Sequence, residues 1–190
     1  TIIKDIEEYE TGENLLTSRT TIIDYLDFLE RLHLIENQEA YNLNYRSPER
    51  VGKSVKRHLV DPSLACACLN LNVDKLMKDL NTFGFALEAL IERDLRVYMD
   101  YLDGKLYHFR DNVSGIEVDS ILEFEDGEYA AAEIKLWYNE VDNAIQNVQV
   151  FYNNMIKKPK FMCVIVGVCQ SVYKDPNTGI YVVPITALRP

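Results

Sequence analysis

Residues Ile116 to Leu136 have the sequence IEVDSILEFEDGEYAAAEIKL, which gives the clearest indication of the fold. Its apolar residues predict two strands, Ile116 to Phe124 and Glu128 to Leu136, joined by the polar segment Glu125-Asp126-Gly127. A three-residue loop of this kind ends on a residue in the left-handed conformation, which Gly127 adopts readily. We therefore expect a β-hairpin at this point of the chain.

The length of this loop decides which side chains share a face of the sheet. A two-residue Asp126-Gly127 turn puts Asp119 on the face opposite Glu133, whereas the three-residue loop puts the two directly opposite each other, about 5 Å apart at Cβ. Asp119, Glu133 and Lys135 then project from one surface. Two carboxylates with the Ile134 carbonyl suit Mg²⁺, and Lys135 would stabilise developing charge or assist deprotonation. The alternative is an exposed hairpin whose charges carry no chemistry.

Helix and strand patterns on both sides extend the hairpin into a sheet. Upstream, the apolar spacing predicts a helix from Phe83 to Leu102 and a strand from Leu106 to Arg110. Downstream, it predicts a helix from about Glu140 to Ile156, a buried strand from Phe161 to Gly167 and a last strand from Ile180 to Ile185. The order helix, three strands, helix, strand, strand predicts an α/β fold, a mixed sheet flanked by helices.

The N-terminal region has a different organisation. Helical spacing of apolar residues predicts a helix from Thr20 to about Leu32, and Leu34-Ile35 and Lys56 to Val60 are short strand candidates. A helix followed by a two-stranded hairpin is typical of the second half of a winged helix. We expect a winged-helix-like segment over residues 1–61 and a second domain, entered through a helical linker, over residues 62–190.

The charge distribution bears on nucleic-acid binding. The net charge of −10 argues against a generic nucleic-acid coat protein. Residues 41–60 nevertheless carry five bases and one acid, a net charge of +4. These bases are Arg46, Arg50, Lys53, Lys56 and Arg57. The segment is either a solvated loop or a basic wing that contacts phosphates.

Composition also constrains the compartment. No apolar run approaches the roughly 20 residues of a membrane span, so we expect no membrane partner. The four cysteines form no disulfide framework and no Cys-x-x-Cys pair. They are Cys66, Cys68, Cys163 and Cys169. We interpret them as small core residues of a protein in the reducing cytoplasm.

Several segments together resemble the C-terminal region of a large family of bacterial AAA+-type ATPases. They are Ser18–Thr21, Asp24–Leu26, Lys56–Ala65, Thr82–Glu88, Arg93–Arg96, Tyr107–Asp111, Glu117–Asp119, Glu133–Lys135 and Tyr181–Ile185. The resemblance implies a partial winged helix followed by a PD-(D/E)XK (restriction-endonuclease-like) fold. Family members carry a P-loop ATPase module before this region, and no Gly-x-x-x-x-Gly-Lys-Ser/Thr motif occurs here. We therefore expect a C-terminal fragment that meets ATP only through its own N-terminal ATPase module, its expected partner.

The resemblance also implies a role for individual residues. Asp119 corresponds to the fold's metal-binding Asp, Glu133 and Lys135 to its Glu-x-Lys pair, and Glu88 to the first-helix acid that completes the metal shell. These residues imply a Mg²⁺-dependent nuclease in which water held on the metal attacks a phosphodiester. Arg110 would either contact a phosphate or pair with a nearby carboxylate.

Two further functions stay open at this point. The nuclease fold could be inactive and bind DNA or a protein partner, so that it regulates the ATPase. The chain could also form a homo-oligomer through a sheet edge at Ile180 to Ile185. A complete set of Asp119, Glu133 and Lys135 favours the nuclease over both.

Overall fold

A six-stranded mixed sheet forms the centre of the structure, a computed structural model that describes residues 18–41, 55–111 and 114–189. Its strand order is β3-β4-β5-β6-β8-β7. The strands are β3 (Lys105–Arg110), β4 (Glu117–Glu123), β5 (Tyr129–Trp137), β6 (Phe161–Val168), β7 (Tyr173–Lys174) and β8 (Tyr181–Pro184). Strands β3, β4 and β5 form an antiparallel meander, and β5, β6 and β8 run parallel to one another. The predicted α/β class with a mixed sheet is confirmed.

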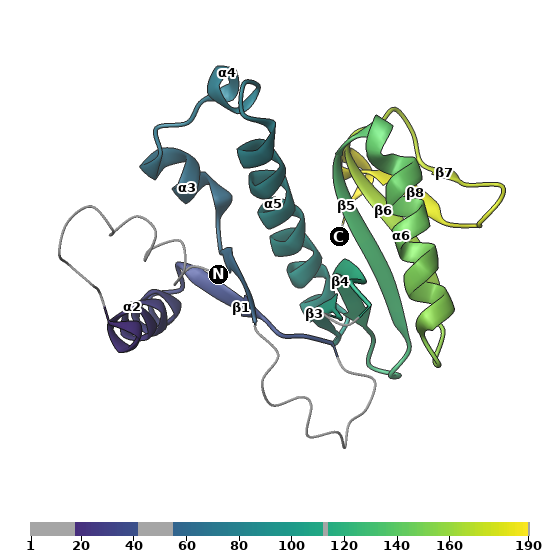
Figure 1. Ribbon diagram of the computed structural model, residues 1–190, viewed down its shortest axis with the longest axis horizontal. Helices are drawn as coiled ribbons and strands as arrows, with labels where there is room; N and C mark the ends of the chain where they lie inside the picture. The colour runs from purple at the N-terminus through teal and green to yellow at the C-terminus, as the bar shows by residue number, and fades with distance from the viewer. Residues whose placement is uncertain (1–17, 42–54, 112–113, 190) are drawn as a thin grey trace.

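One long helix covers each face of this sheet (Figure 1). Helix α5 (Leu80–Tyr101) packs Leu87, Ile91 and Leu95 against β5 and β6, while α6 (Val141–Asn154) packs against the other face of the same strands. Leu90, which the apolar spacing also includes, is only half-buried and lies outside this cluster. The two faces of β5 thereby become two different environments, one towards each helix.

Strand β6 is central, as the sequence predicts. It lies between β5 and β8, and Val164 and Val166 are completely buried under α6. The expectation that the last strand forms a sheet edge is wrong, because β7 pairs with the outer side of β8. The turn that brings β7 there is local: Asp175 accepts hydrogen bonds from Thr178, and Gly179 has a φ of +73°.

The N-terminal part contains the predicted helix and two-stranded hairpin. These are α2 (Arg19–Arg31), β1 (Ile35–Gln38) and β2 (Lys56–Leu59). Ser18 caps α2 by accepting a hydrogen bond from the Thr21 N–H. Beyond β1 the chain reaches the sheet, where Ala40 bridges His108 of β3. The division of the chain at residue 61 stays a prediction.

Tyr41 anchors this N-terminal part to the core of the sheet. Its N–H donates to the His108 carbonyl, and its ring lies 5.6 Å from that of Tyr107 and 5.2 Å from that of Tyr129, between centroids. Two short helices, α3 (Pro62–Cys68) and α4 (Val73–Leu76), then lead into α5. The hairpin is therefore held against the sheet at its edge strand and along α5.

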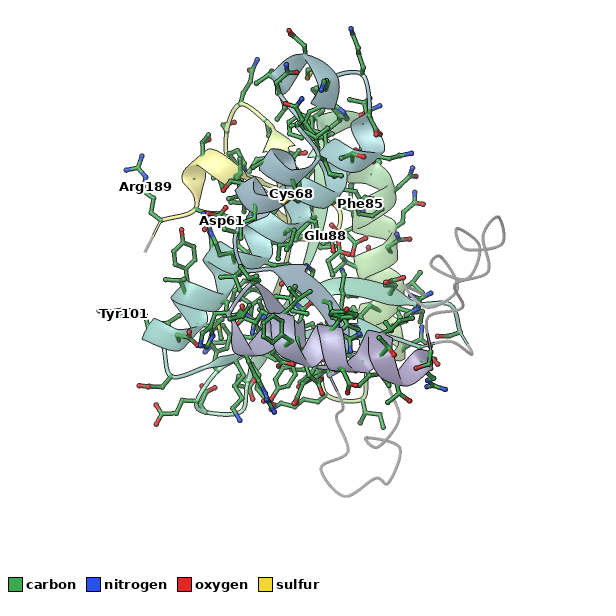
Figure 2. All side chains as sticks on the ribbon, turned by 90° about the vertical axis from the view of Figure 1, so that its left-hand side faces the viewer. Asp61, Cys68, Phe85, Glu88, Tyr101 and Arg189 are labelled. Carbon is green, nitrogen blue, oxygen red and sulfur yellow. The ribbon has the colours of Figure 1, made fainter. Side chains whose placement is uncertain are left out.

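The cysteines are not all core residues. Cys163 is buried and Cys66 and Cys169 are half-buried, but Cys68 is exposed at the end of α3 (Figure 2). Residues two apart on a helix point in nearly opposite directions, so Cys66 and Cys68 cannot both face the core. No helix within the described residues is long and apolar enough to cross a membrane.

Candidate active site

The hairpin between β4 and β5 has the three-residue loop. The Phe124 N–H donates to the Glu128 carbonyl across it at 2.8 Å, and Gly127 has a φ of +74°. The paired residues run from Glu123 opposite Tyr129 to Ser120 opposite Ala132. One further step in this register places Asp119 opposite Glu133, as the three-residue loop predicts.

A β-bulge lies at Asp119 on the other side of β4. Tyr107 pairs with Ile121 and Phe109 pairs with Val118. His108, the one residue between Tyr107 and Phe109, therefore lies opposite two residues of β4, Asp119 and Ser120. A bulge re-aims side chains on the longer strand. Here Asp119 accepts a hydrogen bond at 2.8 Å from the Ile134 N–H, which ties its Oδ2 to β5. Ser120 points to α5 instead.

The four residues implied as catalytic line one cleft of about 620 Å³. Glu88 enters it from α5, Asp119 from β4, and Glu133 and Lys135 from β5. Phe85 stands one helical turn before Glu88 on the same side of α5 (Figure 2). The structure thus brings together side chains that lie up to 47 positions apart in sequence.

Glu133 is a buried carboxylate, and one of its two oxygens has no hydrogen-bond partner among the described residues. Its Oε1 accepts a hydrogen bond from Lys135 Nζ at 2.9 Å, but its Oε2 is buried and has no hydrogen-bond partner among the described residues. Burial and, after it, the charge of Asp119 raise the pKa of Glu133 to about 7, against the opposing effect of Lys135. A buried oxygen of this kind is costly unless something binds it.

Lys56 lies in this cleft too, not on an open wing. Its Nζ forms an ion pair with Glu88 and lies 3.7 Å from Asp119 Oδ1. Burial lowers the pKa of Lys56, but the charges of Glu88 and Asp119 outweigh burial, and its pKa lies above the ordinary value. Burial raises the pKa of Glu88, opposed by Lys56. An ammonium group therefore occupies the space between these two carboxylates.

The cleft suits a divalent cation only in part as it stands. Four carboxylates and two ammonium groups line it, two net negative charges when all are ionised. Asp119 and the unpartnered oxygen of Glu133 supply the hard oxygen donors that Mg²⁺ prefers. Yet no group of three His, Cys, Asp or Glu side chains in the described part of the chain is arranged to hold a metal ion. Glu88 is paired with Lys56 instead.

A buried polar network that sequence reasoning missed supports the cleft from below. Glu92, one turn after Glu88 on α5, accepts hydrogen bonds from Ser120 Oγ at 2.5 Å and from Gln38 Nε2 at 2.9 Å. Gln38 Oε1 in turn contacts His58 Nε2 at 2.9 Å. Burial raises the pKa of Glu92 to about 8. The one sequence signal was the helical i, i+4 spacing of Glu88 and Glu92.

Two other predicted phosphate contacts that the structure describes, Arg57 and Arg110, do not line the cleft. Arg57 is exposed on β2, and Arg110 pairs with Glu117 at 3.8 Å, which matches the carboxylate alternative. Arg46, Arg50 and Lys53 lie outside the described residues. Of the two bases of this segment that the structure describes, Lys56 lines the cleft and Arg57 does not.

Comparison with known families reaches only the N-terminal part. Residues 3–75 match a domain of unknown function (DUF8612). That match covers less than half of the chain and, of the residues lining the cleft, includes only Lys56. No curated protein and no solved structure matches the chain.

Proposed function

We propose that this chain contains a PD-(D/E)XK nuclease-like domain that hydrolyses phosphodiester bonds with a divalent cation, Mg²⁺ being the expected one. The observation that carries the proposal is the pairing of Asp119 with Glu133, whose Oε2 is buried without a hydrogen-bond partner among the described residues. The element order α5, β3, β4, β5, α6, β6 agrees with the helix, three-stranded meander, helix and strand of that fold.

Each residue has a distinct task in this proposal. Asp119 and Glu133 would hold the ion, with Glu88 as a third carboxylate at the same cleft. A divalent cation supplies a Lewis acid that stabilises negative charge on phosphoryl oxygens. The hydrogen bond from the Ile134 N–H keeps Asp119 oriented before any ion binds, so less reorganisation is needed on binding.

Lys135 acts as a cation in this scheme and not as a base. Burial lowers the pKa of Lys135, but the charges of Glu133 and Asp119 together raise it above the ordinary value. A protonated Nζ at neutral pH can donate to a phosphoryl oxygen and cannot accept a proton from water. The structure therefore favours charge stabilisation among the two roles that the sequence leaves open.

The wider context of the domain is part of the proposal. We place it in the cytoplasm, after a P-loop ATPase module of its own chain, with α2, β1 and β2 as a partial winged helix that contacts DNA. The second candidate function is an inactive nuclease fold that binds DNA or a protein. The specific observation in its favour is the ammonium group of Lys56 between Glu88 and Asp119.

Hydrolysis of plasmid and oligonucleotide substrates with Mg²⁺ or Mn²⁺ tests the proposal. We expect cleavage that EDTA abolishes and that falls at least about a hundredfold in Asp119→Asn and Glu133→Gln. Glu117→Gln is the matched control, because Glu117 lines the same cleft but pairs with Arg110. Metal binding without cleavage of any substrate would favour the inactive alternative, and absence of metal binding would overturn the proposal.

A further inference from the structure

We propose that Lys56 is a tethered counter-ion of the cleft, which a divalent cation has to displace before Glu88 can join Asp119 and Glu133. This inference rests on the proposed function and names a regulation of the same site. Metal occupancy would thereby be coupled to the position of a side chain from the N-terminal hairpin, which lies within the family match, whereas Glu88, Asp119 and Glu133 lie outside it.

The ammonium group of Lys56 lies between two carboxylates of the cleft. Its Nζ lies in an ion pair with Glu88 and 3.7 Å from Asp119 Oδ1, so one cation bridges carboxylates from α5 and β4. The three side chains are largely withdrawn from solvent, with exposed fractions of 26%, 22% and 15% for Lys56, Glu88 and Asp119. Water therefore screens the attraction only in part.

The hairpin that carries Lys56 is anchored to α5. Gln38 of β1 donates to Glu92 of α5 at 2.9 Å, and Arg96 of α5 pairs with Glu36 of β1 at 2.8 Å. Strand β2 is paired with β1 along its whole length, from Ile35 opposite Leu59 to Gln38 opposite Lys56. The backbone of Lys56 is thus held beside α5, so an exchange of cations at the cleft would have to move its flexible side chain.

Charge repulsion keeps the Lys56 ammonium group and a divalent ion from occupying the same position in the cleft. An ammonium group within about 4 Å of a divalent ion in a partly buried cleft is strongly unfavourable. The lysine side chain is long and flexible, and the cleft of about 620 Å³ gives it room to swing away. The exchange leaves Glu88 as a third carboxylate at the ion.

Isothermal titration of the full chain with Mg²⁺ and with Mn²⁺, together with thermal unfolding, tests the inference. We expect Lys56→Gln to bind either ion at least about tenfold more tightly than the wild type. It should also unfold at a lower temperature without metal and gain more from added metal. Arg57→Gln, which removes the same charge from the next residue of β2, should behave like the wild type, because Arg57 is exposed.

The outcomes separate the inference from the proposed function. If the wild type binds metal and Lys56→Gln binds it no more tightly, the inference is wrong and the proposed function stands. If neither protein binds metal, the proposed function fails. Should Lys56→Gln not fold, Lys56→Arg decides: a guanidinium group holds two carboxylates more firmly, so metal affinity must fall below that of the wild type, and an unchanged affinity would overturn the inference.

Discussion

The main-chain N–H of Ile134 donates a 2.8 Å hydrogen bond to Oδ2 of Asp119, across the point where the pairing of β4 and β5 ends. It fixes one carboxylate of the candidate site to the strand that carries the other. The register that makes this bond comes from the turn at Gly127, and the bulge in β4 turns the Asp119 side chain towards it.

Glu133→Gln should abolish metal binding and stabilise the metal-free protein. The pKa of Glu133 is about 7 in the folded protein and 4.5 in the unfolded chain. The folded protein therefore binds more protons between these values, and its stability falls as the pH rises through this window. A neutral glutamine has no such loss, so at pH 8 the variant should be more stable by about 3 kcal/mol. Urea unfolding at pH 5 and pH 8 measures the difference, and a variant less stable at pH 8 would mean that Glu133 is only a structural partner of Lys135.

The affinity for Mg²⁺ should rise with pH up to about pH 7 and then level off. Only the ionised form of Glu133 can bind the cation, and its pKa lies at about 7. Below that value each pH unit should therefore change the apparent affinity up to about tenfold. Titration at pH 6 in two buffers of different ionisation enthalpy should show proton release on binding. A flat affinity between pH 5.5 and 8 would exclude Glu133 as a ligand.

Glu92→Ala should destabilise the protein by about 3 kcal/mol and weaken metal binding. It leaves Ser120 Oγ and Gln38 Nε2 without their acceptor, and Ser120 adjoins Asp119 in the bulge. Glu92→Gln is the matched control. The carboxyl group has a pKa of about 8 and is mostly protonated at neutral pH, so an amide of the same shape should cost less than about 1 kcal/mol. Equal losses in both variants would show that the charge of Glu92, not its hydrogen bonds, matters.

Two glycine-to-alanine changes should have opposite effects on stability. A Cβ added at Gly127 or at Gly84 meets no atom within 4 Å, so only the backbone decides. Gly127 has a φ of +74°, and Gly127→Ala should cost about 1 kcal/mol. Gly84 lies inside α5, and Gly84→Ala should stabilise by about 0.5–1 kcal/mol. Chemical denaturation measures both, and a loss in Gly84→Ala would show that a close approach at α5 had been missed.

The hairpin and its flanking elements follow from local sequence. Gly127 and a three-residue loop set the register, and the register places Asp119 opposite Glu133 without reference to the rest of the chain. The long helices and the buried strand β6 show apolar spacing strong enough to predict their place on or in the sheet. The short strand β7 escaped prediction because two residues carry no periodicity.

Long-range contacts decided the rest of the site. Gln38 and Glu92 are 54 residues apart in sequence and meet only because the N-terminal hairpin lies along α5. The composition of the basic segment predicts a surface feature. In the tertiary structure, however, the Lys56 side chain lies in the cleft beside Glu88 and Asp119. Local sequence patterns were enough to predict the longer strands, the turn and the opposition of Asp119 and Glu133, because backbone conformation and side-chain alternation are local properties. The position of Lys56 between Glu88 and Asp119 depends on long-range packing, because it joins β2, α5 and β4, which local patterns cannot place against each other.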